Sequence, residues 1–591
     1  MRELPITEAA GRRGGAGRDL LLAAALGLIF SVFWAIGDWD RLGRLVLPDT
    51  DDMMRLAQIR DWLAGQAFDD WSQRRAGPPE GASMHWSRLN DLAPAAIIAA
   101  LTPLAGRHAA EVAAVLAWPA LLFTLNLFLL ARIARRLWSA EAAPIASVLG
   151  ALAYPGITAF LPGRIDHHAL QTVMVELTLL ALTRPAGVRG GLAAGACAAA
   201  SLVIGLETAP QLAALLLVPF ALWIVRGAAE RERLLGIGVG LCGATGLAVL
   251  WLRPRLWSRD LCDAFTPASS TAALLGGAAL IGLALATPKL RDSRVRLLAG
   301  GTAGAVVLAV VLGGFPACLA GPYGAVHPFL LAEYMPHITE TIGLLAQPDL
   351  ASAIGMGGLT LTGVVGAVWM VARRPARWPV TAPAAAVVLA SAAVALYQLR
   401  GVYLGSPLAA PVLAGLVLAA RRRLSHRALA LAGAWLLSSG VAHASAAVLA
   451  NRLVVGPRAP EGTATGSCEA GRTGAALDRF APGVVMTGVN HAAYLIAATR
   501  HSSVGASYHR NDRGNVAMYR FFLSPPARAA AIARRWRVDY AAFCPGDFGE
   551  IDVTRRYPGS VAALLAAGRT PPGWRRLPLR DTPMRFYRVE H

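Results

Sequence analysis

Apolar runs of membrane-spanning length recur along most of the chain, separated by short polar segments. The first begins at Leu20 and the last ends at Leu449. A helix needs about 20 apolar residues to cross the hydrocarbon core of a bilayer. From about Asn451 onward, short apolar runs alternate with polar ones, which favours a small α/β fold. The pattern predicts an α-helical polytopic membrane domain over residues 1–450 and a small C-terminal soluble α/β domain over 451–591.

Composition excludes an ordinary soluble protein. The chain is 55% hydrophobic and 16% charged, with a mean hydropathy of +0.48, whereas soluble domains are about one quarter charged. Arginines dominate the net charge of +20, and they stand in short clusters between apolar runs, as at residues 421–423. That distribution is typical of the positive-inside rule and does not indicate a nucleic-acid partner.

The arginine clusters also predict the topology. Placing them in the cytoplasm gives about thirteen spans, an N-terminus inside and a soluble domain outside. Arg253, Arg255 and Arg259 oppose the rule, because they fall outside in this scheme. We therefore expect a multi-pass protein of the inner (plasma) membrane, with a periplasmic C-terminal domain and external loops at about residues 37–91 and 317–352.

The first external loop carries the carboxylates Asp49, Asp51 and Asp52, followed by residues 53–63. Met53, Leu56, Ile59 and Leu63 recur at helical spacing, which predicts an amphipathic helix along the membrane surface. A carboxylate at its start either caps the helix or coordinates a cation. Capping does not need all three.

A second polar cluster stands at the outer end of an apolar run. Residues 155–168 end in Asp166, His167 and His168. Ionisable residues at a bilayer boundary are costly, so they indicate a functional site. Mixed oxygen and nitrogen ligands suit a divalent metal, and a solvated helix cap is the alternative.

Further polar residues fall on the same predicted face. Arg88 and His85 beside Trp86 suit a phosphate or sugar at the interface, or else anchor the loop there. Glu207 separates two apolar runs and Arg400 opens another. A shared site explains these residues better than separate accidents do.

The order and spacing of these motifs resemble the catalytic subunits of oligosaccharyltransferases, which are membrane glycosyltransferases of the GT-C fold. Asp52, with Asp51 as the competing match, resembles the family's first acidic motif, which precedes an interfacial helix. Asp166 and His168 resemble the second, with the histidine that archaeal members carry. The resemblance implies that these residues hold Mg²⁺ or Mn²⁺, and Asp52 is our first choice for the catalytic base.

Two later motifs extend the resemblance. Glu333, followed by Tyr-Met-Pro, is similar to the family's loop glutamate, which holds the acceptor or completes the metal site; Glu340 is a weaker match. Arg400 is similar to the arginine that meets the donor phosphate, and Arg88 and His85 would assist it. The resemblance also implies about thirteen spans and an external C-terminal domain.

One family motif is missing. The Trp-Trp-Asp-Tyr-Gly sequence that recognises an Asn-x-Ser/Thr acceptor should fall near residues 485–492, where at most Gly488 survives. Residues 499–514 are instead rich in hydrogen-bond donors and form either a glycan- or phosphate-binding segment or a hydrogen-bonded surface loop. The candidate acceptor-binding residues are His167, Glu207, Tyr508, His509, Arg510 and Asn511.

In the soluble domain, residues 538–544 and 585–589 are predicted to form buried strands. Cys468 and Cys544 either pair there or stay as separate thiols.

Three functions remain open at this point. The favoured one is a metal-dependent glycosyltransferase that uses a polyprenyl-phosphate or polyprenyl-pyrophosphate donor and a non-sequon acceptor: a glycan, a lipid or a protein site. The second is an N-glycosylating oligosaccharyltransferase with a diverged acceptor motif. The third is a glycolipid transporter or flippase, although no inverted repeat is visible.

Overall fold

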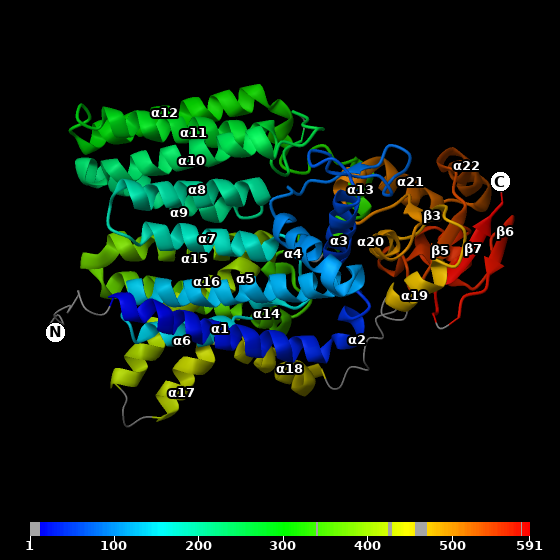
Figure 1. Cartoon of the computed structure of the whole chain (residues 1–591), viewed down its shortest axis with the longest axis horizontal. Helices are drawn as coiled ribbons and strands as arrows, with labels where there is room; N and C mark the ends of the chain where they lie inside the picture. Colours follow the sequence, from blue (N-terminus) through cyan, green and yellow to red (C-terminus); the bar gives the residue numbers. More distant parts are fainter. Residues whose placement is uncertain are drawn as a thin grey trace.

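The computed structural model describes residues 12–259, 261–338, 341–423, 428–455, 468, 470–580 and 582–590. A bundle of long helices forms one end of the molecule, and a mixed α/β domain forms the other (Figure 1). The bundle helices are α1 (Arg12–Gly37), α4 (Leu92–Ala105), α5 (Arg107–Leu137), α6 (Ala142–Ala151), α7 (His168–Leu182), α8 (Val188–Ile204), α9 (Ala209–Arg226), α10 (Arg231–Trp251), α11 (Pro267–Ala286), α12 (Ser293–Gly314), α14 (Leu350–Arg373), α15 (Trp378–Tyr397), α16 (Arg400–Arg423), α17 (Ala428–Leu437) and α18 (Gly440–Val455).

Within the described residues, eight helical segments are long and apolar enough to cross a membrane, or nine if the bent pair α17 and α18 is one span. Four shorter apolar helices, α4, α6, α7 and α8, accompany them. The polytopic helical class is therefore confirmed, while the count of about thirteen spans stays a prediction.

Small residues allow the bundle helices to approach closely. A Cβ atom on Gly195 of α8 would stand 2.2 Å from the carbonyl oxygen of Ile237 on α10, and one on Gly240 would stand 2.4 Å from that of Leu192. Such backbone contact is what small residues provide in membrane helices, where lipid offers no hydrophobic drive for association.

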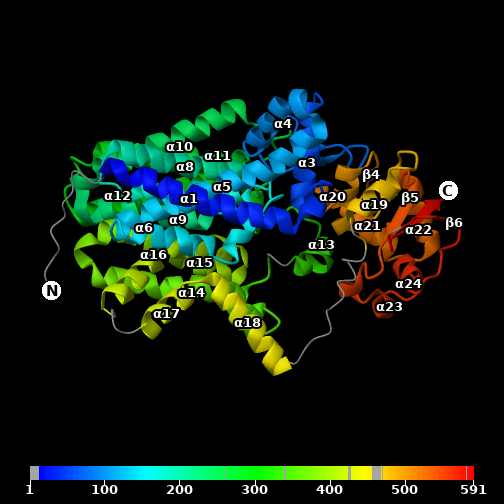
Figure 2. The same ribbon diagram turned by 60° about the horizontal axis from the view of Figure 1, so that its bottom comes forward.

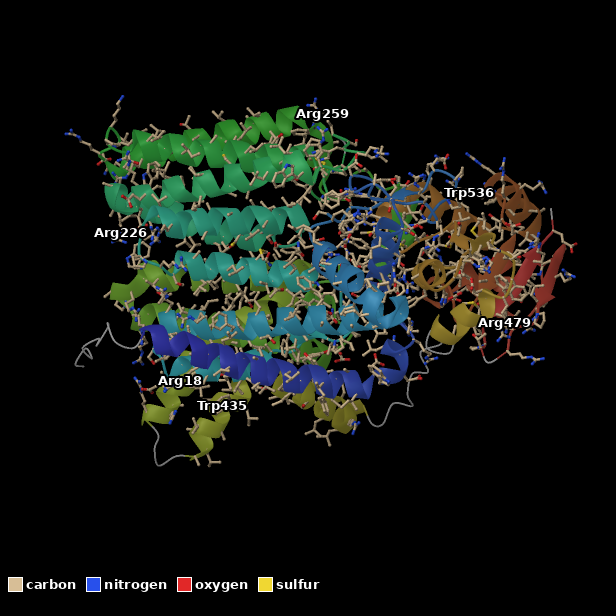
Figure 3. The ribbon with its side chains drawn as sticks, in the orientation of Figure 1. Arg18, Arg226, Arg259, Trp435, Arg479 and Trp536 are labelled. Carbon is tan, nitrogen blue, oxygen red and sulfur yellow. A yellow bond between two sulfur atoms is a disulfide. The ribbon has the colours of Figure 1, made fainter. Side chains whose placement is uncertain are left out.

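The two ends of the bundle differ in the residues and elements that lie there. Figure 3 places Arg18 and Arg226 at the end away from the α/β domain, whereas Arg259 lies at the end that faces it. Three short helices from the loops predicted to be external also lie at this second end: α2 (Trp39–Leu42), α3 (Thr50–Leu63) and α13 (Pro328–Glu333) (Figures 1 and 2). The short antiparallel pair β1 (Ser72–Gln73) and β2 (Ala82–Ser83) belongs to the same loop as α3.

Helix α3 forms where the sequence pattern predicts it. Its first residue follows Asp49, whose side chain accepts a hydrogen bond from the backbone N–H of Asp51 and so caps the helix. Residues Asp52–Ile59 are all buried, because α3 packs between the bundle and α20 (Val489–Ala498) of the α/β domain. The helix runs across the bundle axis in Figure 1, but protein covers all of its sides over Asp52–Ile59, so its expected place along the membrane surface stays a prediction.

The C-terminal domain is built on a five-stranded mixed sheet in the order β4-β3-β5-β7-β6. β3 is parallel to β4 and β5, while β7 is antiparallel to β5 and β6. This confirms the predicted α/β fold and both predicted strand segments. The strands are β3 (Val484–Met486), β4 (Ser502–Ser503), β5 (Tyr540–Phe543), β6 (Trp574–Leu577) and β7 (Arg585–Val589); the other helices are α19 (Ala470–Leu477), α21 (Asp512–Phe522), α22 (Pro526–Trp536), α23 (Val553–Arg556) and α24 (Val561–Ala566).

Two disulfides stabilise this end of the molecule. Cys468 is bonded to Cys544 within the α/β domain, which settles the alternative left open by the sequence. Cys262 is bonded to Cys318, a pair not expected from the sequence, and it joins two loops at the bundle end facing the α/β domain. Cys197 and Cys242, on bundle helices, are free thiols.

Candidate functional site

A tight turn before α7 positions the central residues. Gly163 has φ +88°, and a Cβ atom there would stand 2.8 Å from Cδ of Pro48 and 2.9 Å from Cδ2 of Leu42. Glycine is therefore the residue that fits this turn. The backbone N–H of Gly163 donates to the carbonyl of Val115 (2.8 Å), and Asn90 Nδ2 donates to the carbonyl of Ile165 (2.8 Å). These bonds fix residues 164–168 against the first external loop.

Asp52 is joined directly to this turn. Its Oδ1 accepts a hydrogen bond from the backbone N–H of Asp166 (2.9 Å), and its Oδ2 lies 3.1 Å from Nη1 of Arg164. The same Arg164 nitrogen donates to Oδ2 of Asp49 (2.8 Å). The Asp52 side chain is fully buried. Burial raises the pKa of Asp52 to about 7, although Arg164 opposes that rise.

The Asp166-His167-His168 triplet forms a chain of polar contacts. His167 Nδ1 contacts Oδ1 of Asp166 (2.5 Å), and its Nε2 contacts Oε1 of Glu207 (3.2 Å). Burial opposes the imidazolium, yet the two carboxylates raise the pKa of His167 to about 10. His167 is thus a cation that bridges two anions, and both of its ring nitrogens are used.

His168 and Glu207 complete this group. His168 Nε2 lies 3.4 Å from Oδ2 of Asp166, and its side chain is 24% exposed, facing the cavity described next. Gln171, one turn further along α7, donates to Oε2 of Glu207 (2.9 Å). A Cβ atom on Gly205 would stand 2.2 Å from that same oxygen, so the loop before α9 closes tightly around Glu207.

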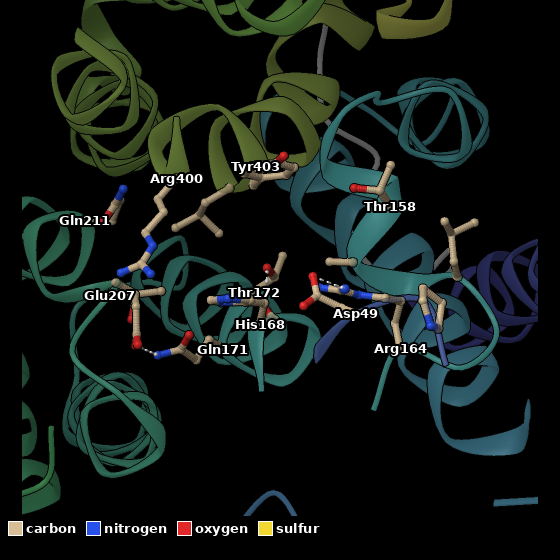
Figure 4. Close-up of a pocket in the computed structure, with 15 residues that line it drawn as sticks. Asp49, Thr158, Arg164, His168, Gln171, Thr172, Glu207, Gln211, Arg400 and Tyr403 are labelled. Atoms are coloured by element: carbon tan, nitrogen blue, oxygen red, sulfur yellow. Dashed lines mark hydrogen bonds and ion pairs between the residues drawn. The ribbon is translucent and has the colours of Figure 1, made fainter. Parts of the chain in front are cut away.

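His168, Gln171 and Glu207 line a cavity of about 210 Å³ at the end of the bundle, while Asp52, Asp166 and His167 are buried beside them. Figure 4 shows His168, Gln171 and Thr172 between two charged pairs: Asp49 with Arg164 on one side, and Glu207 facing Arg400 on the other. Arg400 Nη1 also contacts the hydroxyl of Tyr323 (3.4 Å). The cavity combines carboxylate, imidazole and guanidinium groups, so its residues are suited to hold both a cation and an anion.

The donor set fits a divalent metal. Oδ2 of Asp52 and Oδ2 of Asp166 are both buried and accept no hydrogen bond from the described residues. Each oxygen has a basic neighbour, Arg164 Nη1 at 3.1 Å from that of Asp52 and His168 Nε2 at 3.4 Å from that of Asp166, and a divalent cation would compensate their burial further. Ligand atoms of Asp166, His167 and His168 lie within 4.8 Å of one another. Because both ring nitrogens of His167 are engaged, Asp166 and His168 are the candidate ligands, with Asp52 beside them.

Several residues predicted for the site lie elsewhere. Arg88 is 1% exposed and donates to Gln58, Gln66, Asp70 and Asp91, so it organises the first external loop rather than lining the cavity. Glu333 ends α13, where both of its oxygens pair with Arg556 of the α/β domain (2.7 and 3.0 Å). Glu340 lies outside the described residues.

Asp51 interacts with Tyr508 of the α/β domain: burial is the main cause that raises the pKa of Tyr508, and the charge of Asp51 and a hydrogen bond to it raise it further. The hydroxyl of Tyr508 donates to the carbonyl of Thr50 (3.1 Å), and its ring packs against Trp86.

The other candidates from residues 499–514 stand at the contact between domains. Asn511 Nδ2 donates to the carbonyl of Val504 (2.9 Å) inside the α/β domain. His509 and Arg510 both contact Asp263, and the His85 ring lies 5.0 Å from that of His509. In the part of the chain that the structure describes, the side chains of His509, Arg510 and Asn511 do not line the 210 Å³ cavity.

The sequence pattern missed several polar residues of the cavity, among them Arg164 and Gln171. Asp49 was predicted as either a helix cap or a cation ligand. The Pro162-Gly163 pair could have indicated Arg164, because the residue that follows a tight turn just before Asp166 lies close to that carboxylate. Gln171 lies one turn after His168, so helical spacing could have found it.

Comparison with known proteins establishes the fold. No protein-family model matches the sequence, and no curated protein matches it. Solved structures of the Archaeoglobus fulgidus oligosaccharyltransferase AglB do match. Its complex with an inhibitory peptide and a dolichol-phosphate is 13% identical, with a TM-score of 0.65 over 94% of this chain and 72% of that chain. The apo form is 13% identical, with a TM-score of 0.66 over 95% of this chain and 73% of that chain. The complex with Zn and sulfate is 15% identical, with a TM-score of 0.63 over 92% of this chain and 70% of that chain.

The chain therefore has the GT-C fold, a helical membrane bundle with a small C-terminal domain. In particular, the chain has the fold of the archaeal oligosaccharyltransferase. This confirms the fold predicted from the order of the sequence motifs.

Proposed function

We propose that the protein is an integral-membrane glycosyltransferase that takes a sugar or oligosaccharide from a polyprenyl-phosphate or polyprenyl-pyrophosphate donor. The observation that supports this most is the cavity at the end of the bundle, in which His168 lies between Arg164 and Arg400 with the Asp166 carboxylate 3.4 Å from its Nε2. The protein of the same fold that binds dolichol-phosphate supports a lipid-linked donor.

Arg400 binds the donor phosphate in this proposal. Its guanidinium faces the cavity and already lies near a carboxylate, Glu207, so a phosphate has a cationic partner within the same pocket. A planar guanidinium can donate two parallel hydrogen bonds to a phosphate, which fixes its orientation. The lipid tail would remain among the apolar bundle helices.

Asp166, His168 and Asp52 would hold Mg²⁺ or Mn²⁺. The metal would supply Lewis-acid stabilisation of negative charge on the departing phosphate. His167 keeps Asp166 oriented through one ring nitrogen and is itself held by Glu207 through the other. The archaeal structure in complex with Zn and sulfate supports a divalent cation and an anion as ligands.

Asp52 is the proposed base that takes the acceptor's proton, with Asp51 as the alternative. A base works best when its pKa lies near the working pH, and burial brings that of Asp52 to about 7. The backbone N–H of Asp166 fixes its orientation.

The acceptor is proposed to be a glycan, a lipid or a protein site other than an Asn-x-Ser/Thr sequon. An AglB structure is tethered to a peptide containing the NVT sequon. The segment expected to read a sequon is, in this chain, the end of β3 and the start of α20, where Asn490 is exposed and His491 pairs with Asp547 (2.9 Å). It carries no tryptophan or aspartate.

The site is proposed to face the outside of the inner membrane. Arg18 and Arg226 lie at the bundle end away from the α/β domain, as the positive-inside rule favours for a cytoplasmic end, although Arg259 lies at the other end. The two disulfides, Cys262–Cys318 and Cys468–Cys544, lie at the cavity end or in the α/β domain, and disulfides persist in oxidising compartments.

Donor consumption tests the proposal. Membranes that contain the protein are incubated with extracted lipid-linked sugars and Mn²⁺, and the remaining donor is measured by chromatography. We expect the donor to be depleted. Asp166→Ala and His168→Ala should each slow depletion at least about a hundredfold, and a chelator should do the same. His337→Ala, at an exposed histidine of an external loop, is the matched control.

Two outcomes would contradict the proposal. If the donor is still depleted in the presence of a chelator, the reaction does not need the proposed metal. If an Asn-x-Thr peptide is glycosylated, the acceptor is a sequon.

A further inference from the structure

A second cluster of potential metal ligands lies outside the cavity. It consists of His85 from the first external loop, Asp263 from the loop between α10 and α11, and His509 from the α/β domain. One ligand atom from each lies within 4.8 Å of the other two. The three residues are far apart in the sequence, so the cluster exists only because the two domains meet there.

The contacts within the cluster already resemble those of a metal site without its ion. His509 Nε2 contacts Oδ2 of Asp263 at 2.5 Å. Arg510 donates to both oxygens of Asp263 (2.7 and 2.9 Å) and so orients the carboxylate. Metal ligands in proteins are commonly oriented in this way by a hydrogen bond from a residue that does not itself touch the metal. The Asp263 side chain is 5% exposed.

His85 supplies the observation that points to a ligand. Its Nδ1 is buried and has no hydrogen-bond partner among the described residues. A buried ring nitrogen without a partner is costly. Its ring lies 5.0 Å from that of His509 and packs on Trp86 at 4.7 Å, so it is held in place beside the Asp263–His509 pair.

The surroundings fix the cluster firmly. Asp263 follows Cys262, whose disulfide to Cys318 ties its loop to the segment that carries Tyr323. The Tyr323 ring stands edge-on to that of His509 at 5.3 Å. A ligand set held by packing on every side loses little freedom when a metal binds.

We propose that His85, Asp263 and His509 form a zinc site that fastens the α/β domain to the membrane domain. Two imidazoles and one carboxylate are a ligand set that Zn²⁺ takes, with a fourth position left for water. Zn²⁺ would replace the proton that His509 Nε2 shares with Asp263 and would engage Nδ1 of His85. The site is separate from the Asp166–His168 pair and does not depend on the function proposed above.

Metal analysis of the purified full-length protein tests the site. The protein is stripped with a chelator, loaded with Zn²⁺, desalted and analysed by mass spectrometry. The control His337→Ala should retain one Zn²⁺ more than His85→Ala or His509→Ala. A variant with both Asp166→Ala and His168→Ala should keep this ion, which distinguishes the two sites.

His85→Ala is the decisive variant, because it leaves the contacts of His509 and Arg510 with Asp263 intact. It should weaken Zn²⁺ binding at least about tenfold and abolish the rise in unfolding temperature that Zn²⁺ gives the control. Equal Zn²⁺ content in His85→Ala and His337→Ala would overturn the proposal. So would an X-ray absorption spectrum of the ion lost on mutation that shows no imidazole ligands.

Discussion

Gly205 provides a sharp test of how Glu207 supports the site. The substitution Gly205→Ala would place a Cβ atom 2.2 Å from Oε2 and 3.1 Å from Cδ of Glu207. Ordinary contact needs more than about 3.4 Å, so the carboxylate must move by about 1 Å or more. Gly205 itself has extended backbone, with φ −178°, and alanine adopts that conformation without strain.

The carboxylate that moves is the one that holds His167 and Gln171. Hydrogen bonds to charged groups contribute about 1.5–3 kcal/mol each, and about 1.4 kcal/mol is a factor of ten in affinity. If Asp166 and His168 hold the metal, Gly205→Ala should therefore weaken Mn²⁺ binding at least about tenfold. Electron paramagnetic resonance of free Mn²⁺ over the purified protein measures this directly.

A double variant separates this cause from general damage. In Gly205→Ala with Glu207→Ala, the closest clash is gone and only the end of the flexible Gln171 side chain, whose Nε2 is 2.9 Å from the Cβ position, must shift slightly, so the double variant should bind Mn²⁺ within about twofold of Glu207→Ala alone. Gly243→Ala is the matched control, because a Cβ atom at Gly243 meets nothing within 4 Å. Normal Mn²⁺ binding by Gly205→Ala, or additive losses in the double variant, would refute the reasoning.

Three further predictions concern residues away from this loop. Arg400→Ala should weaken donor-lipid binding by about 1.5–3 kcal/mol in a flotation assay, because it removes a charge-assisted phosphate contact. Glu333→Ala should leave donor depletion nearly unchanged and cost at most about 1 kcal/mol of stability, because its pair with Arg556 is half exposed. Maleimide should label Cys468 and Cys544 in the denatured protein only after reduction.

Each of these has a matched control and a contrary outcome. Arg189→Ala changes an exposed arginine at the start of α8, and Glu80→Ala changes an exposed glutamate paired with Arg513. Cys197, a free thiol, should label without reduction. Undiminished donor binding by Arg400→Ala, a large loss of depletion in Glu333→Ala, or labelling of Cys468 before reduction would contradict the corresponding prediction.

The parts of the site that could be predicted are those whose chemistry is local in sequence. Asp166 and His168 stand two residues apart, and hydropathy places them at a helix end. Charge clusters then place that end on the same side as Asp52 and Arg400. Periodicity likewise predicted α3 and the strands β5 and β7, because their apolar positions record which face is buried.

The parts that could not be predicted depend on long-range packing. Arg164 reaches Asp49 across 115 residues of sequence, and no local pattern announces that pair. Arg88 looks in sequence like an interfacial phosphate ligand, yet loop packing consumes its donors on Gln58, Gln66, Asp70 and Asp91. Glu333 matches a family motif in sequence, whereas its position depends on where the α/β domain puts Arg556.

Charge balance in the cavity leads to a last prediction. Arg164 already pairs with Asp49 and Asp52, and His167 pairs with Asp166 and Glu207. A divalent cation alone would add positive charge to a site whose carboxylates are already paired, and a phosphate alone would add negative charge beside them. Uncompensated charge is costly where water is largely excluded. The two ligands should therefore bind cooperatively, with a coupling of about 1–3 kcal/mol, or 5- to 150-fold. Polyprenyl phosphate should increase Mn²⁺ affinity by that factor in the unmodified protein, and much less in Arg400→Ala. Equal Mn²⁺ affinity with and without the lipid phosphate would show that the cation and the anion occupy separate places, and the shared cavity would lose its proposed role.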